Sequence, residues 1–418
     1  MAQQLAQPST VEAAFHSIVS ARLINCVYQP IVRLADEAVV GFEALARGPA
    51  GTAWEHPITL IRYAAVAGRL PELDWVCRAA AIRGALQAEL PAQIPLFINI
   101  EPVSSRSACP PDLWPIIDAG VHRLQIVVEV TERAVAADPA ALLATATRLR
   151  HEYGNLALDD VGADAASEAL MPLLNPDIIK LDRSITQAAT SSHAVQVITS
   201  ARRQAHRTGA LILAEGIETE AHLAAARALG AALGQGWRWG RPAPQPLPAP
   251  PMSLDLPHLA TPVSVADTPF DTAQRQLTTV AAHRTEVEAA RRSVENHASR
   301  VPEPKVLLAT LAAGEHTLDD NRYQRLATRT AITGLFGPHL ADHSEARSRI
   351  WTIHTTGVLA NELDTLSIAS SGMMAMFARP SHDNGDEHYD MITTTDPDLI
   401  VQAAQPLLSQ LQAAPLNE

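Results

Sequence analysis

Residues 156–160 read Leu-Ala-Leu-Asp-Asp, and this short stretch contains the pattern that decides the fold. An apolar run of strand length ends in acidic side chains, and similar runs recur along the first 240 residues. The other runs end at Glu43, Asn99, Glu129 and Glu215. Longer Ala-, Leu- and Arg-rich stretches of helical period, such as residues 58–90 and 192–208, lie between most of them. The sequence therefore indicates repeated strand–helix units.

Eight candidate strands can be counted, at residues 25–34, 38–47, 96–100, 124–130, 156–160, 178–181, 211–215 and 232–237. Eight strands and their helices in about 220 residues predict an α/β fold, a TIM-type (β/α)8 barrel. Only Ala35-Asp36-Glu37 separates the first two strands, which is too short for a helical crossover, so an antiparallel hairpin should begin the barrel. The carboxyl ends of the strands then gather the acidic and amide side chains into a ring that faces a cleft.

Composition limits the partners and the compartment. A net charge of −13 argues against binding polymeric nucleic acid or an anionic membrane through a general basic surface. Three cysteines, none in a zinc-type spacing, indicate buried or inert thiols. Because there is no signal peptide and no apolar run of membrane-spanning length, we expect a cytoplasmic protein.

The chain of 418 residues exceeds the size of one typical core, so two domains are expected. We predict an N-terminal extension (1–19), a barrel (20–245), a linker (241–265) that begins with the proline-rich RPAPQPLPAPP, and a smaller C-terminal α/β domain (266–418). In that domain we expect helices at 268–300, 319–336 and 396–411, the last capped by Asp396, and strands at 306–309, 350–356, 373–379 and 389–395.

Several ordered motifs resemble the EAL family of cyclic di-GMP phosphodiesterases. They are Tyr28-Gln29-Pro30-Ile31, Glu43-Ala44-Leu45-Ala46-Arg47, Phe97-Ile98-Asn99-Ile100, Glu129-Val130-Thr131-Glu132, Leu158-Asp159-Asp160, Ile179-Lys180-Leu181-Asp182, Ala214-Glu215-Gly216-Ile217-Glu218 and Gln235-Gly236. The resemblance implies metal-dependent hydrolysis of cyclic di-GMP to linear pGpG. Hard oxygen ligands suit Mg²⁺ or Mn²⁺, and two such ions about 3.5–4 Å apart suit in-line hydrolysis of a phosphodiester.

The resemblance also implies a role for each matched residue. Glu43, Asn99, Glu129 and Asp159 would bind one metal, and Asp159 would be shared with a second metal that also uses Asp160, directly or through water. Glu215 would be a further ligand or the partner of the attacking water, which Lys180 would polarise. Arg47 would contact a substrate phosphate, and Gln29, Glu218 and Gln235 would line the substrate pocket. Glu132 would anchor the loop that follows Asp160.

That loop departs from the family pattern, because Val161-Gly162-Ala163-Asp164-Ala165-Ala166-Ser167 replaces the usual Phe-Gly-Thr-Gly-Tyr-Ser-Ser. The departure keeps a second hypothesis open, a cyclic di-GMP receptor with weak or no turnover. The C-terminal region is similar to the DICT sensory domain, which implies a regulatory role and further signalling partners. The family also implies a homodimer.

Overall fold

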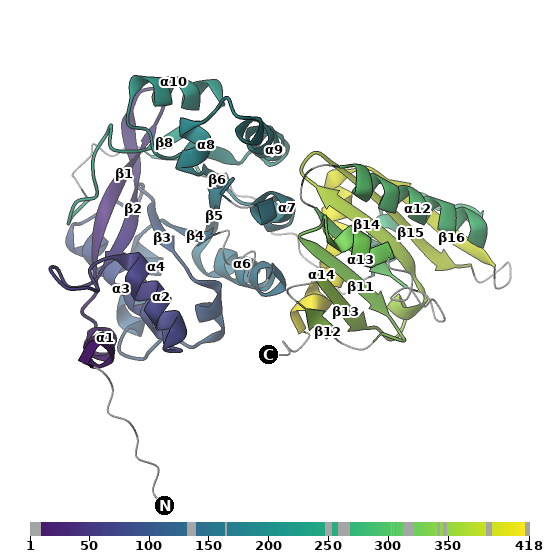
Figure 1. The fold of residues 1–418 in the computed structure, drawn as a ribbon, viewed down its shortest axis with the longest axis horizontal. Helices are drawn as coiled ribbons and strands as arrows, with labels where there is room; N and C mark the ends of the chain where they lie inside the picture. Colours follow the sequence, from purple (N-terminus) through teal and green to yellow (C-terminus); the bar gives the residue numbers. More distant parts are fainter. Residues whose placement is uncertain are drawn as a thin grey trace, which may run out of the picture.

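The computed structural model describes residues 10–131, 139–163, 165–246, 253–257, 268–301, 303, 305–311, 322–340, 343–345, 349–381 and 387–413. Two strand assemblies follow one another along the chain, a closed barrel and an open sheet (Figure 1). The helices α6, α7 and α9 of the barrel face the second assembly. Among the described residues, no helix combines the length and apolarity that a membrane crossing requires.

The barrel closes through eight strands in the order of the sequence. They are β1 (Asn25–Arg33), β2 (Ala38–Arg47), β3 (Leu96–Asn99), β4 (Ile126–Thr131), β5 (Asn155–Val161), β6 (Ile178–Leu181), β7 (Leu211–Ala214) and β8 (Leu233–Gln235). β1 pairs antiparallel with both β2 and β8, and every other neighbouring pair is parallel. The predicted eight strands and first hairpin are confirmed.

Helices surround the barrel. They are α1 (Thr10–Ser20), α2 (Pro57–Val66), α3 (Leu70–Gln87), α4 (Trp114–Arg123), α6 (Pro139–Tyr153), α7 (Ala165–Leu174), α8 (Arg183–Gln187), α9 (Ser192–Thr208) and α10 (Glu220–Ala228), with the 3-10 helix η1 (Pro102–Arg106) after β3. The sequence fixes the ends of α9: the Ser191 side chain accepts a hydrogen bond from the Ala194 N–H, and Gly209 ends the helix at φ +84°.

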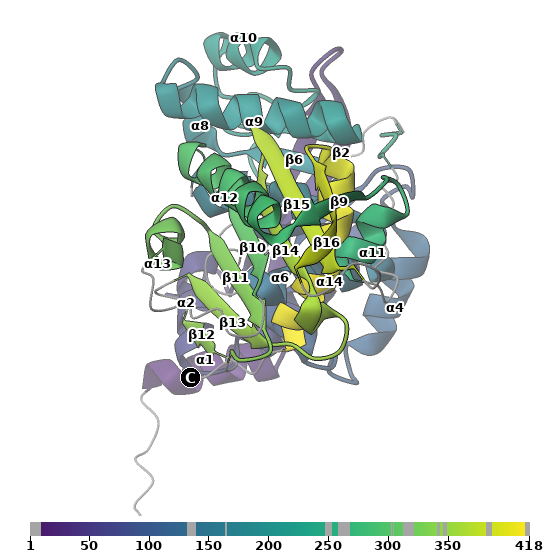
Figure 2. The same cartoon turned by 90° about the vertical axis from the view of Figure 1, so that its right-hand side faces the viewer.

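The second assembly is an eight-stranded mixed sheet with the order β12-β13-β11-β10-β14-β15-β16-β9. Its strands are β9 (Val280–His283), β10 (Val306–Thr310), β11 (Ile332–Gly337), β12 (His343–Glu345), β13 (Ile350–His354), β14 (Leu363–Ala369), β15 (Gly372–Pro380) and β16 (His388–Thr394). Its helices are α11 (Pro269–Gln274), α12 (Arg284–Arg300), α13 (Arg322–Ala327), η2 (Leu359–Asn361) and α14 (Pro397–Ala413). Figure 2 shows α12 in front of the sheet and α14 behind it, on the side of the barrel.

Two predictions for this region were wrong. Residues 268–300 do not form one helical stretch, because the edge strand β9 separates α11 from α12 and pairs with β16. Residues 319–336 do not form one helix either, since β11 takes Ile332–Gly337 into the sheet beside β10 and β13. The predicted C-terminal helix is confirmed, and Asp396 caps it by accepting hydrogen bonds from the N–H groups of Asp398 and Leu399.

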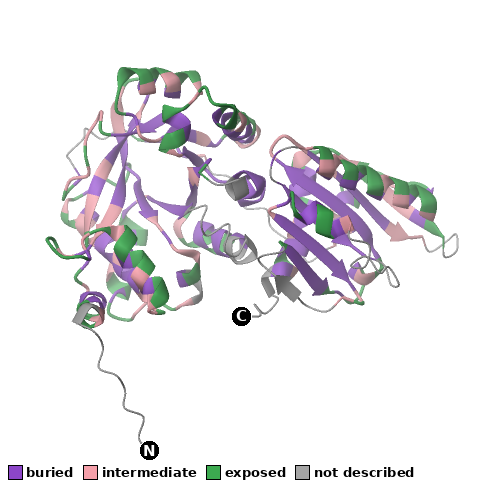
Figure 3. Cartoon of the chain, in the orientation of Figure 1, coloured by how far each residue is buried: buried purple, intermediate pink, exposed green. Residues whose placement is uncertain are grey.

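Helices of the barrel pack against the second sheet. Helix α14 contacts α6, and β14 contacts α7, and one cluster of buried residues includes members of both assemblies. Figure 3 colours the buried residues of each assembly purple. Polar contacts join the two as well, since Arg207 pairs with Asp398 at 2.5 Å and the Ser370 hydroxyl lies 2.9 Å from the Ser200 hydroxyl. The C-terminal sheet therefore rests on the helices that flank β5.

The segment that leaves the barrel is partly seated on it. Tyr28 and Ala243 exchange two backbone hydrogen bonds, and Leu254 and Leu256 are each only 9% exposed. These leucines join a cluster of barrel-interior residues that includes Phe97. The predicted linker positions 247–252 and 258–265, like positions 1–9 of the predicted N-terminal extension, lie outside the described residues.

Candidate active site

Strands of the barrel bring acidic and amide side chains to one end of it. Backbone register sets Gln29 opposite Glu43 and Asn99 opposite Glu129 on neighbouring strands. The barrel interior at this level is therefore polar, whereas apolar residues fill the opposite end. This is the carboxyl end of the parallel strands, where TIM barrels carry their active sites.

Two groups of carboxylates are close enough to share a metal ion. Glu43, Glu129 and Asp159 each offer an oxygen within 4.8 Å of the others, and so do Asp159, Asp160 and Glu215. Asp159 belongs to both groups. Carboxylate oxygens are the ligands that Mg²⁺ and Mn²⁺ prefer, so the chemistry of the donor set fits two such ions.

A distortion of β5 sets the directions in which the side chains of Asp159 and Asp160 point. The register between β5 and β6 shifts between Leu158 and Val161, and Asp160 adopts φ +54°. Aspartate tolerates this left-handed backbone better than most residues do. The Asp160 N–H donates to Asp159 Oδ1 at 3.0 Å. A β-bulge of this kind redirects side chains, and here it lets consecutive residues contribute to both groups.

Lys180 lies among four of the carboxylates. Its Nζ is 2.7 Å from Glu129, 2.8 Å from Asp159, 3.0 Å from Glu215 and 3.7 Å from Glu43. All four contacts are within ion-pair distance. Burial alone would lower the pKa of Lys180, but the surrounding carboxylates raise it well above its usual range. Lys180 therefore stays charged.

The carboxyl groups respond to burial in different ways. Burial raises the pKa of Glu129 well above its usual range, and Lys180 offsets only part of that rise. Burial also raises the pKa of Glu215 to about 8, with Lys180 opposing and Asp159 adding to the shift. For Glu43, burial is outweighed by Lys180 and by hydrogen bonds, so its pKa is lowered. A cluster with more carboxylates than cations holds protons that a divalent ion would displace.

Amide side chains orient Glu43. Gln235 Nε2 donates to Glu43 Oε2 at 2.7 Å and lies 3.4 Å from Gln29 Oε1, and Asn99 Nδ2 donates to Glu43 Oε1 at 3.2 Å and to Glu129 Oε2 at 3.0 Å. As a metal ligand Asn99 would have to present its oxygen instead, which a half-turn of the amide achieves. The sequence did not predict that Gln235 would hold Glu43.

Two glycines explain why the loop after β7 can approach β8. A Cβ on Gly236 would lie 2.0 Å from the carbonyl oxygen of Ile217, and Gly216 has φ +68°. The Ile217 N–H donates to the Gln235 carbonyl at 3.0 Å. The loop that carries Glu215 is thereby fixed against Gln235. The glycine directly after Gln235 in the sequence is the signal that could have predicted this close approach.

Two other predicted site residues, Arg47 and Glu218, make their hydrogen bonds away from the described residues of the carboxylate cluster. The guanidinium of Arg47 donates to the Ala46 carbonyl at 2.7 Å. Glu218 is exposed just before α10, and its N–H donates to His222 Nδ1 at 3.4 Å. Glu132 and Asp164 lie outside the described residues.

Comparison with known proteins places similarity in the barrel. A family model described as the EAL domain matches residues 12–242. An Escherichia coli protein named "Probable cyclic di-GMP phosphodiesterase PdeB" is 31% identical over 230 residues, which are 53% of this chain and 43% of that protein. A Caulobacter vibrioides protein named "Uncharacterized signaling protein" is 31% identical over 228 residues, which are 52% of this chain and 27% of that protein. The chain thus spans less than half the length of these relatives.

Among solved structures, a manganese and cyclic di-GMP complex of BlrP1 from Klebsiella pneumoniae is 26% identical to this chain. The alignment covers 58% of each chain with a TM-score of 0.46.

Proposed function

The chain belongs to the EAL domain family, and from this premise we propose that its barrel hydrolyses cyclic di-GMP to linear pGpG with two divalent cations, Mg²⁺ or Mn²⁺. The observation that carries the proposal is the pair of carboxylate groups that share Asp159. Curated relatives named as cyclic di-GMP phosphodiesterases support the choice of substrate.

Residues of both groups would hold the metals. Glu43, Glu129 and Asp159, with the oxygen of Asn99, would bind one ion, and Asp159, Asp160 and Glu215 would bind the other. When bound, the ions would neutralise the phosphate oxygens and make a water more acidic. Gln235 would act as a positioning residue, because its side chain is buried against Glu43.

The two groups next to the attacking water would have different roles. Lys180 keeps its proton, so it would donate to the water and stabilise negative charge on it rather than accept a proton. Glu215 would be a ligand of the second ion or the partner that orients this water. Arg47 and Glu218 would reach the substrate from the rim, and Glu132 would anchor the loop after Asp160.

The second assembly would regulate the barrel. We divide the chain into the extension 1–19, the barrel 20–245, the linker 241–265 and a DICT-like sensory domain 266–418. The packing of α14 on α6 and of β14 on α7 supports a regulatory role, because α7 directly follows the strand that carries Asp159 and Asp160. A homodimer, signalling partners at the sensory domain and a cytoplasmic location complete the proposal.

The test is incubation of the purified protein with cyclic di-GMP and Mn²⁺, with pGpG measured by chromatography. We expect product from the natural sequence and from Glu288→Gln, which changes a partly exposed carboxylate on α12, but none from Glu43→Ala. Tight binding of cyclic di-GMP without product would select the receptor hypothesis. Turnover by Glu43→Ala at the natural rate would remove Glu43 from the mechanism.

A further inference from the structure

A cavity of about 440 Å³ lies in the helix layer outside the barrel, between α4 and α6. Trp75 and Arg78 of α3 line it, as do Trp114 and Ile117 of α4, while Leu149 and Tyr153 of α6 line it from the other helix. The volume is within the usual range for small-molecule sites, about 300–1,000 Å³. The cavity is separate from the carboxylate cluster, whose side chains lie inside the barrel.

Among the described residues that line the cavity, Arg78 carries a buried charge, and this charge is already compensated. Arg78 is only 2% exposed, and its Nε donates to Asp74 Oδ2 at 2.7 Å. The same guanidinium donates to the Ser104 hydroxyl and lies 4.2 Å from the centre of the Trp75 ring. With its charge balanced in this way, Arg78 offers little attraction to an anionic ligand. What remains on the inner walls is mainly aromatic and aliphatic surface.

The described residues on the rim of the cavity carry an excess of negative charge. Asp118 and Glu152 contribute two carboxylates, against one rim guanidinium from Arg148, which lies 3.9 Å from Glu152. All three side chains are exposed. This rim therefore favours an uncharged ligand over a negatively charged one such as a nucleotide. The exposed face of Trp114, which is 57% accessible, instead offers a stacking surface at the entrance.

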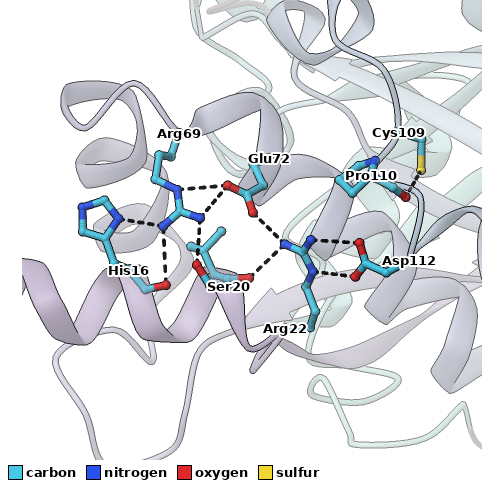
Figure 4. A network of polar contacts seen from close by, with 9 residues as sticks. His16, Ser20, Arg22, Arg69, Glu72, Cys109, Pro110 and Asp112 are labelled. Atoms are coloured by element: carbon cyan, nitrogen blue, oxygen red, sulfur yellow. Dashed lines mark hydrogen bonds and ion pairs between the residues drawn. The ribbon is translucent and has the colours of Figure 1, made fainter.

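The segment that contributes Cys109 to one wall of the cavity is tied to α1 and α3 by the polar network that Figure 4 shows. The wall includes Cys109, and three residues further on Asp112 accepts two hydrogen bonds from Arg22, at 3.0 and 3.1 Å. Arg22 also donates to Glu72 of α3 at 2.8 Å, and Arg69 binds the same carboxylate. The network joins the segment after η1 to α1 and α3. A preformed wall lowers the entropy cost of binding.

We propose that this cavity binds an uncharged aromatic molecule that stacks a planar ring on Trp114 and reaches Trp75. The site goes beyond the proposed hydrolysis and does not depend on it. Such a ligand would touch both α4, which leads into the strand of Glu129, and α6, which leads into the strand of Asp159.

Two dyes that differ by one sulfonate test the proposal on the full chain. N-phenyl-1-naphthylamine is uncharged, and 8-anilino-1-naphthalenesulfonate is its anionic counterpart. We expect saturable 1:1 binding of the uncharged dye by fluorescence titration, and at least tenfold weaker binding of the anionic dye. Trp114→Ala should weaken binding of the uncharged dye at least tenfold. Trp237→Ala is the matched control, since Trp237 is 53% exposed, and it should leave binding unchanged.

Several outcomes would overturn the proposal. They are no saturable binding of the uncharged dye, equal affinity for both dyes, or an equal effect of the two tryptophan substitutions. Because Trp114 is largely exposed, its loss should leave the fold intact, which the melting temperature checks.

Alkylation of Cys109 by N-ethylmaleimide gives a second measurement. Cys109 lines the cavity, so the bound dye should slow its modification at least threefold as measured by mass spectrometry. An unchanged rate would place the dye elsewhere and refute the site.

Discussion

Replacing Lys180 by methionine tests how the carboxylate cluster is stabilised without metal. The substitution keeps an unbranched side chain, one atom shorter, and removes its charge, so Glu43, Glu129, Asp159 and Glu215 lose their shared cation. At an effective dielectric constant of 20, each of the three shortest ion pairs amounts to about 5–6 kcal/mol before other effects are counted. Desolvation of Lys180 and repulsion among the carboxylates cancel most of that sum. Removal of one partner of a buried pair costs about 3–5 kcal/mol, which is our expectation here.

The assay is thermal unfolding at pH 8 with a chelator and then with Mn²⁺. A loss of 3–5 kcal/mol corresponds to about 6–20 °C in the melting temperature of a domain of this size. Adding Mn²⁺ should recover more stability in Lys180→Met than in the natural sequence, because the cation replaces the missing charge.

A second buried lysine provides the matched control. Lys305 is 1% exposed, but its Nζ donates to the carbonyls of Ala298 and Val301 instead of pairing with carboxylates. Lys305→Met should also lower the melting temperature, and Mn²⁺ should not rescue it beyond the effect seen in the natural sequence. A loss below about 1 kcal/mol for Lys180→Met, or equal rescue of the two variants, would refute the reasoning.

Three further predictions concern pH, packing and a buried ion pair. Because the folded-state pKa of Glu215, about 8, exceeds its unfolded value near 4.3, the stability of the metal-free protein should fall as pH rises from 5.5 to 8.5. Calorimetry should show a flatter pH profile for Glu215→Gln. Gly236→Ala should cost about 1–3 kcal/mol and weaken Mn²⁺ binding by calorimetric titration, since its Cβ would displace Ile217. Arg150→Met should cost about 3–5 kcal/mol in urea unfolding, because it leaves the fully buried Asp177 without its guanidinium; a loss under 1 kcal/mol would contradict this.

The strands of the barrel could be predicted closely because the strand pattern of each segment agrees with its burial in the folded barrel. Residues 178–181 form the predicted strand with the predicted bounds, since an apolar run buried on both faces leaves little choice of structure. The acidic residues of the site could also be predicted, because they stand at the ends of such apolar runs. What the sequence could not supply was the contact geometry, such as Gln235 against Glu43, because it depends on how β8 closes against β1.

The C-terminal sheet was harder to predict because pairing partners decide its strands. Val280–His283 lies in a polar stretch of helical appearance and becomes a strand only by pairing with β16. Ile332–Gly337 did carry a usable signal, since its β-branched and aromatic residues favour a strand. The helical pattern assigned to 319–336 obscured that signal.

Leu254 and Leu256 have a practical consequence for dissecting the chain. Both leucines belong to a cluster of barrel-interior residues that precede the acidic positions on their strands, such as Phe97 before Asn99, so they close the barrel at the end remote from the carboxylates. A fragment that ends at the proline-rich stretch would lack these two leucines and would expose the apolar interior residues at this end of the barrel to water. Fragments that contain only the barrel should extend through Pro257, and we expect shorter fragments to aggregate even though they keep every carboxylate of the cluster.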